Sequence, residues 1–412
     1  MTDTVVVDVE AEVDIAAGGR RDAIIEIAVI YGLGVIVALL VNAALLAALG
    51  ANPVTAYGTI VSSALGSVGG LAQTLNRMTP LLLGATAVAF AMRAGYVNLG
   101  VDGQIYAGAI LATGVAFLLD GWPAWLLLPV VLLAGVVGGG LLASIPAWLR
   151  ATRGVNELFV TVMLNFVALF LAEYLATGPW TDPVAGEAIT VPIPDAANLP
   201  VMLPGGGHAG ILLAVPIAVA ASWWLLRTRR GFEFRAVGAN SLAARFGGVR
   251  LVRIGVIALV VAGALGGLAG SIEVTGVHSR LLTGLTPNFG YMAVLIAVLA
   301  RRSPVATIPV AFAFAVLIVG ADSLQRSVNL PASAVLVFQA VVVVTILAFE
   351  TPRGRRWVSR LLPGSGRSAT DGSPGGPSAA GRGPGGPGPG GDDVGGHATG
   401  RGAGTQPAGE GA

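Results

Sequence analysis

Polar side chains interrupt an apolar stretch of the sequence between residues 94 and 106, which reads AGYVNLGVDGQIY. Asn98 and Gln104 carry amides, Asp102 carries a carboxylate, and glycines loosen the backbone around them. Lipid cannot satisfy such groups, so the break must be buried in protein or line a wet cavity. Gly-interrupted apolar segments are typical of transport sites. We therefore predict that Asn98, Asp102 and Gln104 line a substrate pathway; the alternative is a simple cytoplasmic turn between two spans.

A second polar pattern follows in the segment RGVNELFVTVMLN, residues 153–165. Its polar residues are spaced so that a helix would carry them as one stripe: Asn156, Glu157, Thr161 and Asn165. A polar stripe within a membrane faces either a pathway or a neighbouring helix that it hydrogen-bonds. A third segment, Gly276–Met292, ends in PNFGYM and resembles the first break, so Asn288 joins the predicted pathway.

The segment Phe232–Gly248, FEFRAVGANSLAARFGG, predicts a short amphipathic helix in an arginine-rich loop. Asn240 can cap its start, Leu242 and Phe246 lie four apart on one face, and Gly247 suits a left-handed stop. Arg245 lies in the last turn, where the helix dipole favours a cation. Such a helix is suited to docking in a groove of another protein. The alternative is a helix that lies on the lipid surface.

The composition predicts an all-α polytopic membrane protein. Of the 412 residues, 54% are hydrophobic and 11% are charged, and the mean hydropathy is +0.79, whereas soluble domains carry about 25% charged residues. Apolar runs indicate about ten transmembrane helices, with a broken or re-entrant segment near residues 94–104. We expect an acidic cytoplasmic segment at 1–24, a transmembrane domain at 25–350, and a cytoplasmic tail at 351–412 that is first basic and then Gly/Pro-rich and disordered.

The ten predicted spans start near residue 30 and alternate with loops of unequal charge. Their predicted ranges are 30–49, 80–92, 105–119, 124–149, 158–175, 211–226, 254–274, 291–300, 305–319 and 333–349. Residues 52–77 are expected at the outer interface or partly re-entrant. All 24 basic residues are arginines. With both termini inside, only Arg77, Arg280 and Arg326 lie outside, which is the asymmetry expected of a multi-pass protein in this orientation.

Several chemistries are excluded by absent residues. The sequence has no cysteine, hence no disulfide or thiolate metal site, and no lysine, hence no Walker A loop of its own. The three histidines are scattered and are expected at the surface: His208, His278 and His397. Glu173 and Glu273 are expected to reach water at outer span ends. We predict no catalytic residue, no metal, no cofactor and no nucleic-acid partner; the basic character is explained by arginines on cytoplasmic loops.

The motifs GYVNLGVDGQ, RGVNELFVTVMLN and FRAVGANSLAARFGGV, in this order, resemble inner-membrane permeases of ATP-binding-cassette (ABC) importers. The resemblance covers about Ile25–Phe349 and is to the branch of branched-chain amino-acid and ribose-type permeases. Within that branch, nucleoside (simple sugar) permeases look most similar. In the family the first motif usually reads N-x-G-x-E-G-Q, so Asp102 stands where a glutamate is usual.

The resemblance implies a permease in the bacterial inner membrane with several partners: two ABC ATPase subunits, a second homologous permease, and an extracytoplasmic substrate-binding lipoprotein. ATP would be used by the partner subunits. The loop would couple to the ATPase through a set of residues on and before its short helix: Glu233, Arg235, Gly238, Asn240, Leu242, Ala243, Ala244, Arg245, Phe246 and Gly247. The alternatives are a branched-chain amino-acid ABC permease, an ion-coupled secondary transporter with Asp102 as ion ligand, or a non-transporting scaffold or enzyme.

Overall fold

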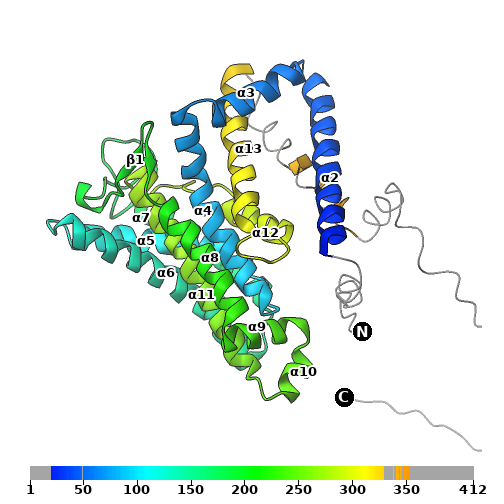
Figure 1. Cartoon of the computed structure of the whole chain (residues 1–412). Coiled ribbons are helices and arrows are strands. Elements are labelled where there is room, and N and C mark those ends of the chain that lie inside the picture. Colours follow the sequence, from blue (N-terminus) through cyan, green and yellow to red (C-terminus); the bar gives the residue numbers. More distant parts are fainter. Residues whose placement is uncertain are drawn as a thin grey trace, which may run out of the picture. The chain divides into compact units, whose positions relative to one another are not determined.

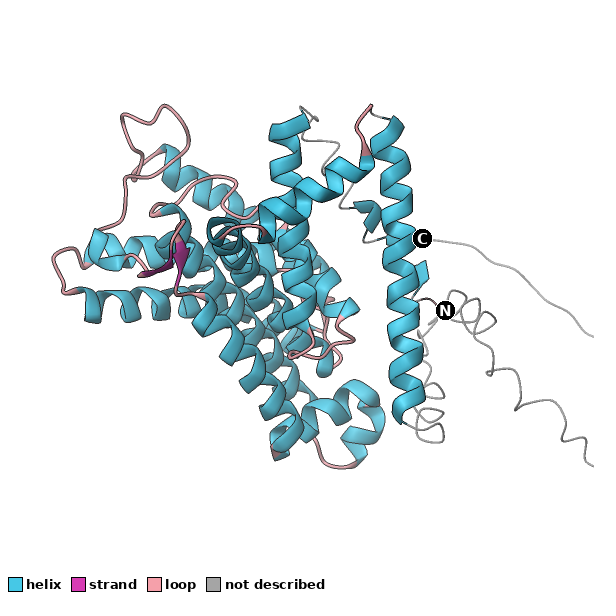
Figure 2. Cartoon of the chain, turned by 45° about the horizontal axis from the view of Figure 1, so that its top comes forward, coloured by secondary structure: helices cyan, strands magenta, loops and turns pink. Residues whose placement is uncertain are grey.

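The structure is a computed structural model that describes residues 20–48, 50–328 and isolated positions between 337 and 351. Helices dominate these residues, and a small two-stranded sheet is the exception (Figures 1 and 2). The α-helices are α2 (Arg20–Ala48), α3 (Pro53–Leu65), α4 (Val68–Arg93), α5 (Val101–Leu118), α6 (Ala124–Arg153), α7 (Glu157–Thr177), α8 (Ile211–Arg227), α9 (Arg229–Ala239), α10 (Ser241–Phe246), α11 (Leu251–Glu273), α12 (Phe289–Leu299) and α13 (Thr307–Val328). The remaining elements are the 3₁₀ turn η1 (Asp195–Ala197), strands β1 (Val201–Leu203) and β2 (Gly207–His208), and the π-helical turn η2 (Val274–His278).

Six helices in the described part of the chain are long and apolar enough to cross a membrane, and counting two bent pairs as single spans gives up to eight. The predicted number of about ten is therefore not confirmed. One reason is that α12 has only 11 residues, which at 1.5 Å per residue is too short for a bilayer of about 30 Å. The predicted span at 333–349 falls mostly outside the described residues, as do positions 1–19 and nearly all of 351–412.

Two predicted boundaries were wrong near the first break. Helix α4 begins at Val68 and carries Pro80 in its interior, although the sequence pattern placed the helix start at Pro80. Helix α5 begins at Val101, so Asp102 and Gln104 lie in its first turn and the break is confined to Ala94–Gly100. An acidic residue in a first turn is favoured by the helix dipole.

Glycines let α6 and α11 approach closely. A Cβ on Gly139 would overlap the carbonyl oxygen of Gly263, and one on Gly267 would overlap that of Gly135. The backbones of the two helices are thus in direct contact, as small residues allow in membranes. Helix α5 packs on the same face of α11, where a Cβ on Gly270 would overlap the carbonyl of Ile105.

Gly139→Ala is expected to destabilise the protein, because the new methyl group has no room between α6 and α11. Overpacking of this kind typically costs about 1–3 kcal/mol. The matched control is the next residue: a Cβ on Gly140 meets its nearest atoms at 3.8 Å, so Gly140→Ala should be neutral or slightly stabilising. Thermal unfolding in detergent checks this pair, and equal melting temperatures for the two variants would contradict the packing.

Two expectations about charged groups at the far end of α11 were wrong. Glu273 is 1% exposed and lies 3.4 Å from the imidazole of His278, so it does not reach water. His208 is also buried, with its Nδ1 accepting a hydrogen bond from the Gly210 amide (3.1 Å), and burial lowers its pKa to about 4. The loop that carries His208 therefore packs onto the helices; His397 lies outside the described residues.

Candidate functional site

The break after α4 is closed by a reciprocal amide pair. The Asn98 Nδ2 donates to Gln104 Oε1 (2.9 Å), and Gln104 Nε2 donates to Asn98 Oδ1 (3.1 Å). The same Asn98 oxygen accepts from the Gly100 amide at 3.0 Å. Both side chains are buried. The two amides thus satisfy one another across the turn that starts α5, as buried polar groups must.

Helix α7 holds this turn through Asn165. The Asn165 Oδ1 accepts from the Gly103 amide (2.8 Å), and its Nδ2 donates to the Leu99 carbonyl (2.9 Å). Gly103 is required here, because a Cβ at that position would lie 2.8 Å from the Asn165 Cα. Thr161, one turn earlier, packs against Gly100, while its hydroxyl donates to the Glu157 carbonyl of its own helix at 2.8 Å. The first two predicted segments therefore meet in one buried cluster.

The third predicted segment joins the cluster through Asp102. The Asp102 Oδ1 accepts a hydrogen bond of 2.6 Å from the Gly290 amide in the first turn of α12. Asn288, just before that helix, adopts a left-handed conformation (φ 60°), and its side chain makes no capping hydrogen bond. The Asp102 carboxylate therefore caps the start of α12, which the Asn288 side chain does not. The helix dipole favours a negative charge at this end.

Two of the predicted pathway residues lie at the edge of this cluster. Asn156 is exposed, and its Oδ1 caps α7 by accepting from the Leu158 amide at 3.0 Å. Glu157 is buried but forms an ion pair with Arg150 at the end of α6. The structure therefore brings together Asn98, Asp102, Gln104, Thr161, Asn165 and the segment of Asn288. The sequence analysis did not identify Gly290 or Arg150 as site residues. Gly290 could have been identified, because it is the glycine of the PNFGYM motif.

The polar side chains of the cluster find hydrogen-bond partners within it. Its polar atoms are bonded to one another across α5, α7 and α12, three helices that are remote in sequence. A shift of one helix against the others would expose amides and a carboxylate together. We name this cluster, Asn98, Asp102, Gln104, Asn165 and Gly290, the polar joint.

The predicted loop helix is α10, and its start is as expected. The Asn240 Oδ1 accepts from the Ala243 amide at 2.9 Å. Leu242 and Phe246 are 62% and 86% exposed, whereas Ala244 faces inward and is buried. The stop was assigned wrongly: Gly247 has φ −74°, and Gly248 takes the left-handed conformation (φ 82°).

The preceding part of the loop is a second helix, α9, which the sequence pattern did not predict. It carries Glu233 and Arg235, and a Cβ on Gly238 near its end would overlap the carbonyl of Arg93. Helix α9 bends away from α8 by 81°. The loop is therefore a folded two-helix unit that rests on the end of α4, with the exposed pair Leu242/Phe246 on its second helix.

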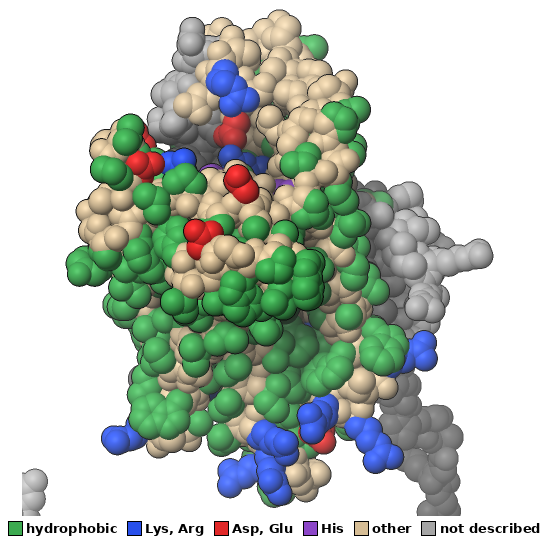
Figure 3. All heavy atoms as spheres, turned by 90° about the vertical axis from the view of Figure 1, so that its left-hand side faces the viewer, with side chains coloured by type: hydrophobic (Ala, Val, Ile, Leu, Met, Phe, Trp, Pro, Cys, Tyr) green, Lys and Arg blue, Asp and Glu red, His purple; other side chains and the backbone are tan. Residues whose placement is uncertain are grey.

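Arginines gather at the end that carries α9 and α10, acidic side chains with some arginines lie at the opposite end, and a largely apolar band lies between them (Figures 1 and 3). Two contacts place further arginines at the first of these ends. The Arg93 Nε donates to the Arg302 carbonyl (2.7 Å), and Arg150 stacks on Tyr96 beside the start of α11. At the other end Arg280 lies 3.4 Å from Asp182. The charge sorting matches a protein that crosses a bilayer.

Comparison with known proteins gives concordant matches. Residues 70–347 match the family described as branched-chain amino acid transport system / permease component. The chain is 37% identical to a glucose ABC transporter permease protein of Haloferax volcanii, over 77% of this chain and 86% of the relative. It is 29% identical to a nucleoside ABC transporter permease protein of Lactococcus lactis (77% and 88%) and 28% identical to a guanosine ABC transporter permease protein of Bacillus subtilis (76% and 91%). The chain is a multi-pass membrane protein and belongs to the branched-chain amino acid transport system permease family.

Proposed function

We propose that this chain is the transmembrane permease subunit of an ABC importer for a simple sugar or a nucleoside. The observation that carries the proposal is the match over 70–347, which contains all three motifs, together with relatives whose names specify glucose, nucleosides and guanosine. These solutes share a neutral, hydroxyl-rich surface. Such a surface is recognised by amides and carboxylates, which are the groups that the polar joint contains.

The polar joint serves as the gate of this permease. The bonds of its side chains to one another and to the backbone of α5 and α12 support a closed state of this gate. Opening exchanges these internal bonds for bonds to the solute, so the two states differ by modest free energies and a partner can select between them. The permease itself carries out no covalent step.

The partners supply energy and substrate. Two ABC ATPase subunits bind at the arginine-rich end, where α10 presents Leu242 and Phe246, and a binding lipoprotein delivers the solute at the other end. A second homologous permease completes the complex. Both termini lie in the cytoplasm of a bacterial cell, since the arginine-rich loops belong inside.

The orientation predicts the behaviour of reporter fusions. A reporter that is active only in the periplasm should be active when inserted near Ala188, in the loop between α7 and α8, and silent when fused after Phe349. Enzyme activity normalised to fusion level measures this. An active fusion after Phe349 with a silent one at Ala188 would reverse the topology, and with it the placement of α10 on the ATPase side.

The substrate class is tested by competition. Cells that express the complete importer take up radiolabelled solute, and unlabelled glucose, guanosine and leucine are added in turn. The proposal expects glucose or guanosine to compete and leucine to have no effect. Competition by leucine alone would assign the chain to the branched-chain amino-acid permeases instead.

A further inference from the structure

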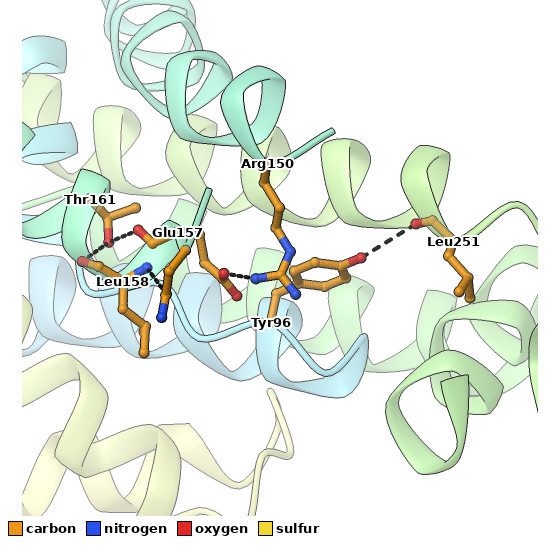
Figure 4. Close-up of polar contacts among 7 residues, drawn as sticks. Tyr96, Arg150, Glu157, Leu158, Thr161 and Leu251 are labelled. Atoms are coloured by element: carbon orange, nitrogen blue, oxygen red, sulfur yellow. Dashed lines mark hydrogen bonds and ion pairs between the residues drawn. The ribbon is translucent and has the colours of Figure 1, made fainter. Parts of the chain in front are cut away.

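Contacts of Arg150 and Tyr96 join α6, α7 and α11 to the break after α4. Arg150, in the last turn of α6, forms an ion pair with Glu157, the first residue of α7, and lies 4.8 Å above the ring of Tyr96 (Figure 4). The Tyr96 hydroxyl in turn donates to the Leu251 carbonyl at the start of α11 (3.4 Å). We call Tyr96, Arg150 and Glu157 the Arg150 cluster. It ties the break after α4 to α6, α7 and α11.

The loop unit of α9 and α10 rests on the residue next to this cluster. A Cβ on Gly238 of α9 would lie 3.1 Å from the Gly95 amide nitrogen, and one on Gly95 (φ 79°) would lie 3.3 Å from the Gly238 Cα. Two glycines thus place backbone directly on backbone. Three aromatic rings pack at the same contact. The ring centroid of Phe234 of α9 lies 5.3 Å from that of Phe90 of α4 and 5.2 Å from that of Trp224 of α8.

The loop unit and the break are closely packed against each other. Tyr96 follows Gly95 directly, and its ring is held between Arg150 and Gly255, where a Cβ would overlap the Tyr96 hydroxyl. Packed interiors shift between discrete arrangements and do not deform continuously. A displacement of α9 must therefore move Tyr96 within its slot or carry Arg150 and Glu157 with it. Asn98 of the polar joint is two residues further on.

We propose that the Arg150 cluster is the positioning device that transmits movement of the α9–α10 loop unit to the polar joint. The inference rests on the proposed function, because the movement is supplied by the ATPase partners. Glu157 is thereby given a role beside the pathway: it couples α7, which carries Asn165, to the break. Arg150 and Tyr96 act through these contacts and touch no substrate.

The first test separates coupling from folding. Arg150→Gln leaves the buried carboxylate of Glu157 without its partner, so both membrane level and uptake should fall. Adding Glu157→Gln removes the unpaired charge, and membrane level should return to that of wild type. Uptake per molecule should stay at least about fivefold below wild type, the lower end of coupling between sites. Arg153→Gln, an exposed arginine of the same helix turn, is the matched control and should change neither. Recovery of uptake in the double variant would overturn the proposal.

The second test follows the movement itself. The chain has no cysteine, so Val97→Cys, half-buried between Tyr96 and Asn98, gives a single reactive thiol. In the purified complete importer, its labelling rate by a water-soluble maleimide should change by about fivefold or more on ATP–vanadate trapping. The change should disappear in the Arg150→Gln, Glu157→Gln background. An equal change of labelling rate in both backgrounds would overturn the role of the Arg150 cluster but not the proposed function. A permease that purifies with no ATPase would overturn both.

Discussion

Asp102→Ala is expected to reduce uptake strongly while the protein still reaches the membrane and still binds its ATPase partners. The Asp102 carboxylate accepts from the Gly290 amide at 2.6 Å and is the link between α5 and α12 in the polar joint. Its removal leaves a helix-start amide without a partner, which costs about 1–3 kcal/mol. That free energy is of the size that separates two states of a gate, so a loss of roughly 5- to 150-fold in uptake follows. Initial rates of radiolabelled solute uptake, divided by membrane level, measure the effect.

Two further substitutions distinguish the roles of Asp102. Asp102→Glu should retain uptake, because the resemblance to ABC permeases implies that a glutamate is usual at this position. Asp102→Asn keeps an acceptor for the Gly290 amide but removes the charge, so partial uptake would assign the effect to the hydrogen bond. If the alanine and glutamate variants lose protein from the membrane equally, Asp102 has a folding role and is not part of a gate.

Leu242→Ala combined with Phe246→Ala is expected to separate the permease from its ATPase. The two side chains are 62% and 86% exposed on α10 although both are large and apolar, and apolar side chains on one helix face can anchor the helix in a groove of a partner. Truncating a buried interface anchor typically costs about 2–4 kcal/mol, or roughly 30- to 1000-fold in affinity. The ATPase retained by detergent-solubilised, affinity-purified permease should fall accordingly.

The matched control for this pair lies at the other end of the molecule. Val184 and Val201 are also apolar and exposed (90% and 67%), but they belong to the loop between α7 and α8. Val184→Ala combined with Val201→Ala should leave the bound ATPase unchanged. A full complement of ATPase and solute-stimulated ATP hydrolysis in the α10 double variant would show that α10 lies on lipid, which the arginines of the loop would equally suit.

Local sequence signals predicted much of the site. The Asn240 cap and the Leu242/Phe246 spacing act within one helix or on its surface, and both are present as expected. Of the predicted polar stripe on α7, Thr161 and Asn165 lie against the break. These features follow from periodicity and residue type, which are readable without knowledge of the tertiary structure.

The parts that could not be predicted depend on which elements meet. Asn165 pairs with Leu99 and Gly103, and Asp102 with Gly290, across long sequence separations that carry no local signal. The start of α4 was predicted wrongly at Pro80, which lies in the helix interior. Neighbouring helices can accommodate a proline that would break an isolated helix. The partnership of Arg150 with Glu157 was hidden for a similar reason: an arginine at a span end is expected on charge asymmetry alone.

ATP, and not an ion gradient, is expected to drive uptake by the complete importer. The complete importer is reconstituted in proteoliposomes with ATP, with a non-hydrolysable ATP analogue, or with an imposed proton or sodium gradient and no nucleotide. Glucose or guanosine should accumulate with ATP alone, and a protonophore should leave this accumulation unchanged. Uptake driven by an ion gradient without ATP, and lost on adding the protonophore, would contradict this expectation and make the chain an ion-coupled transporter.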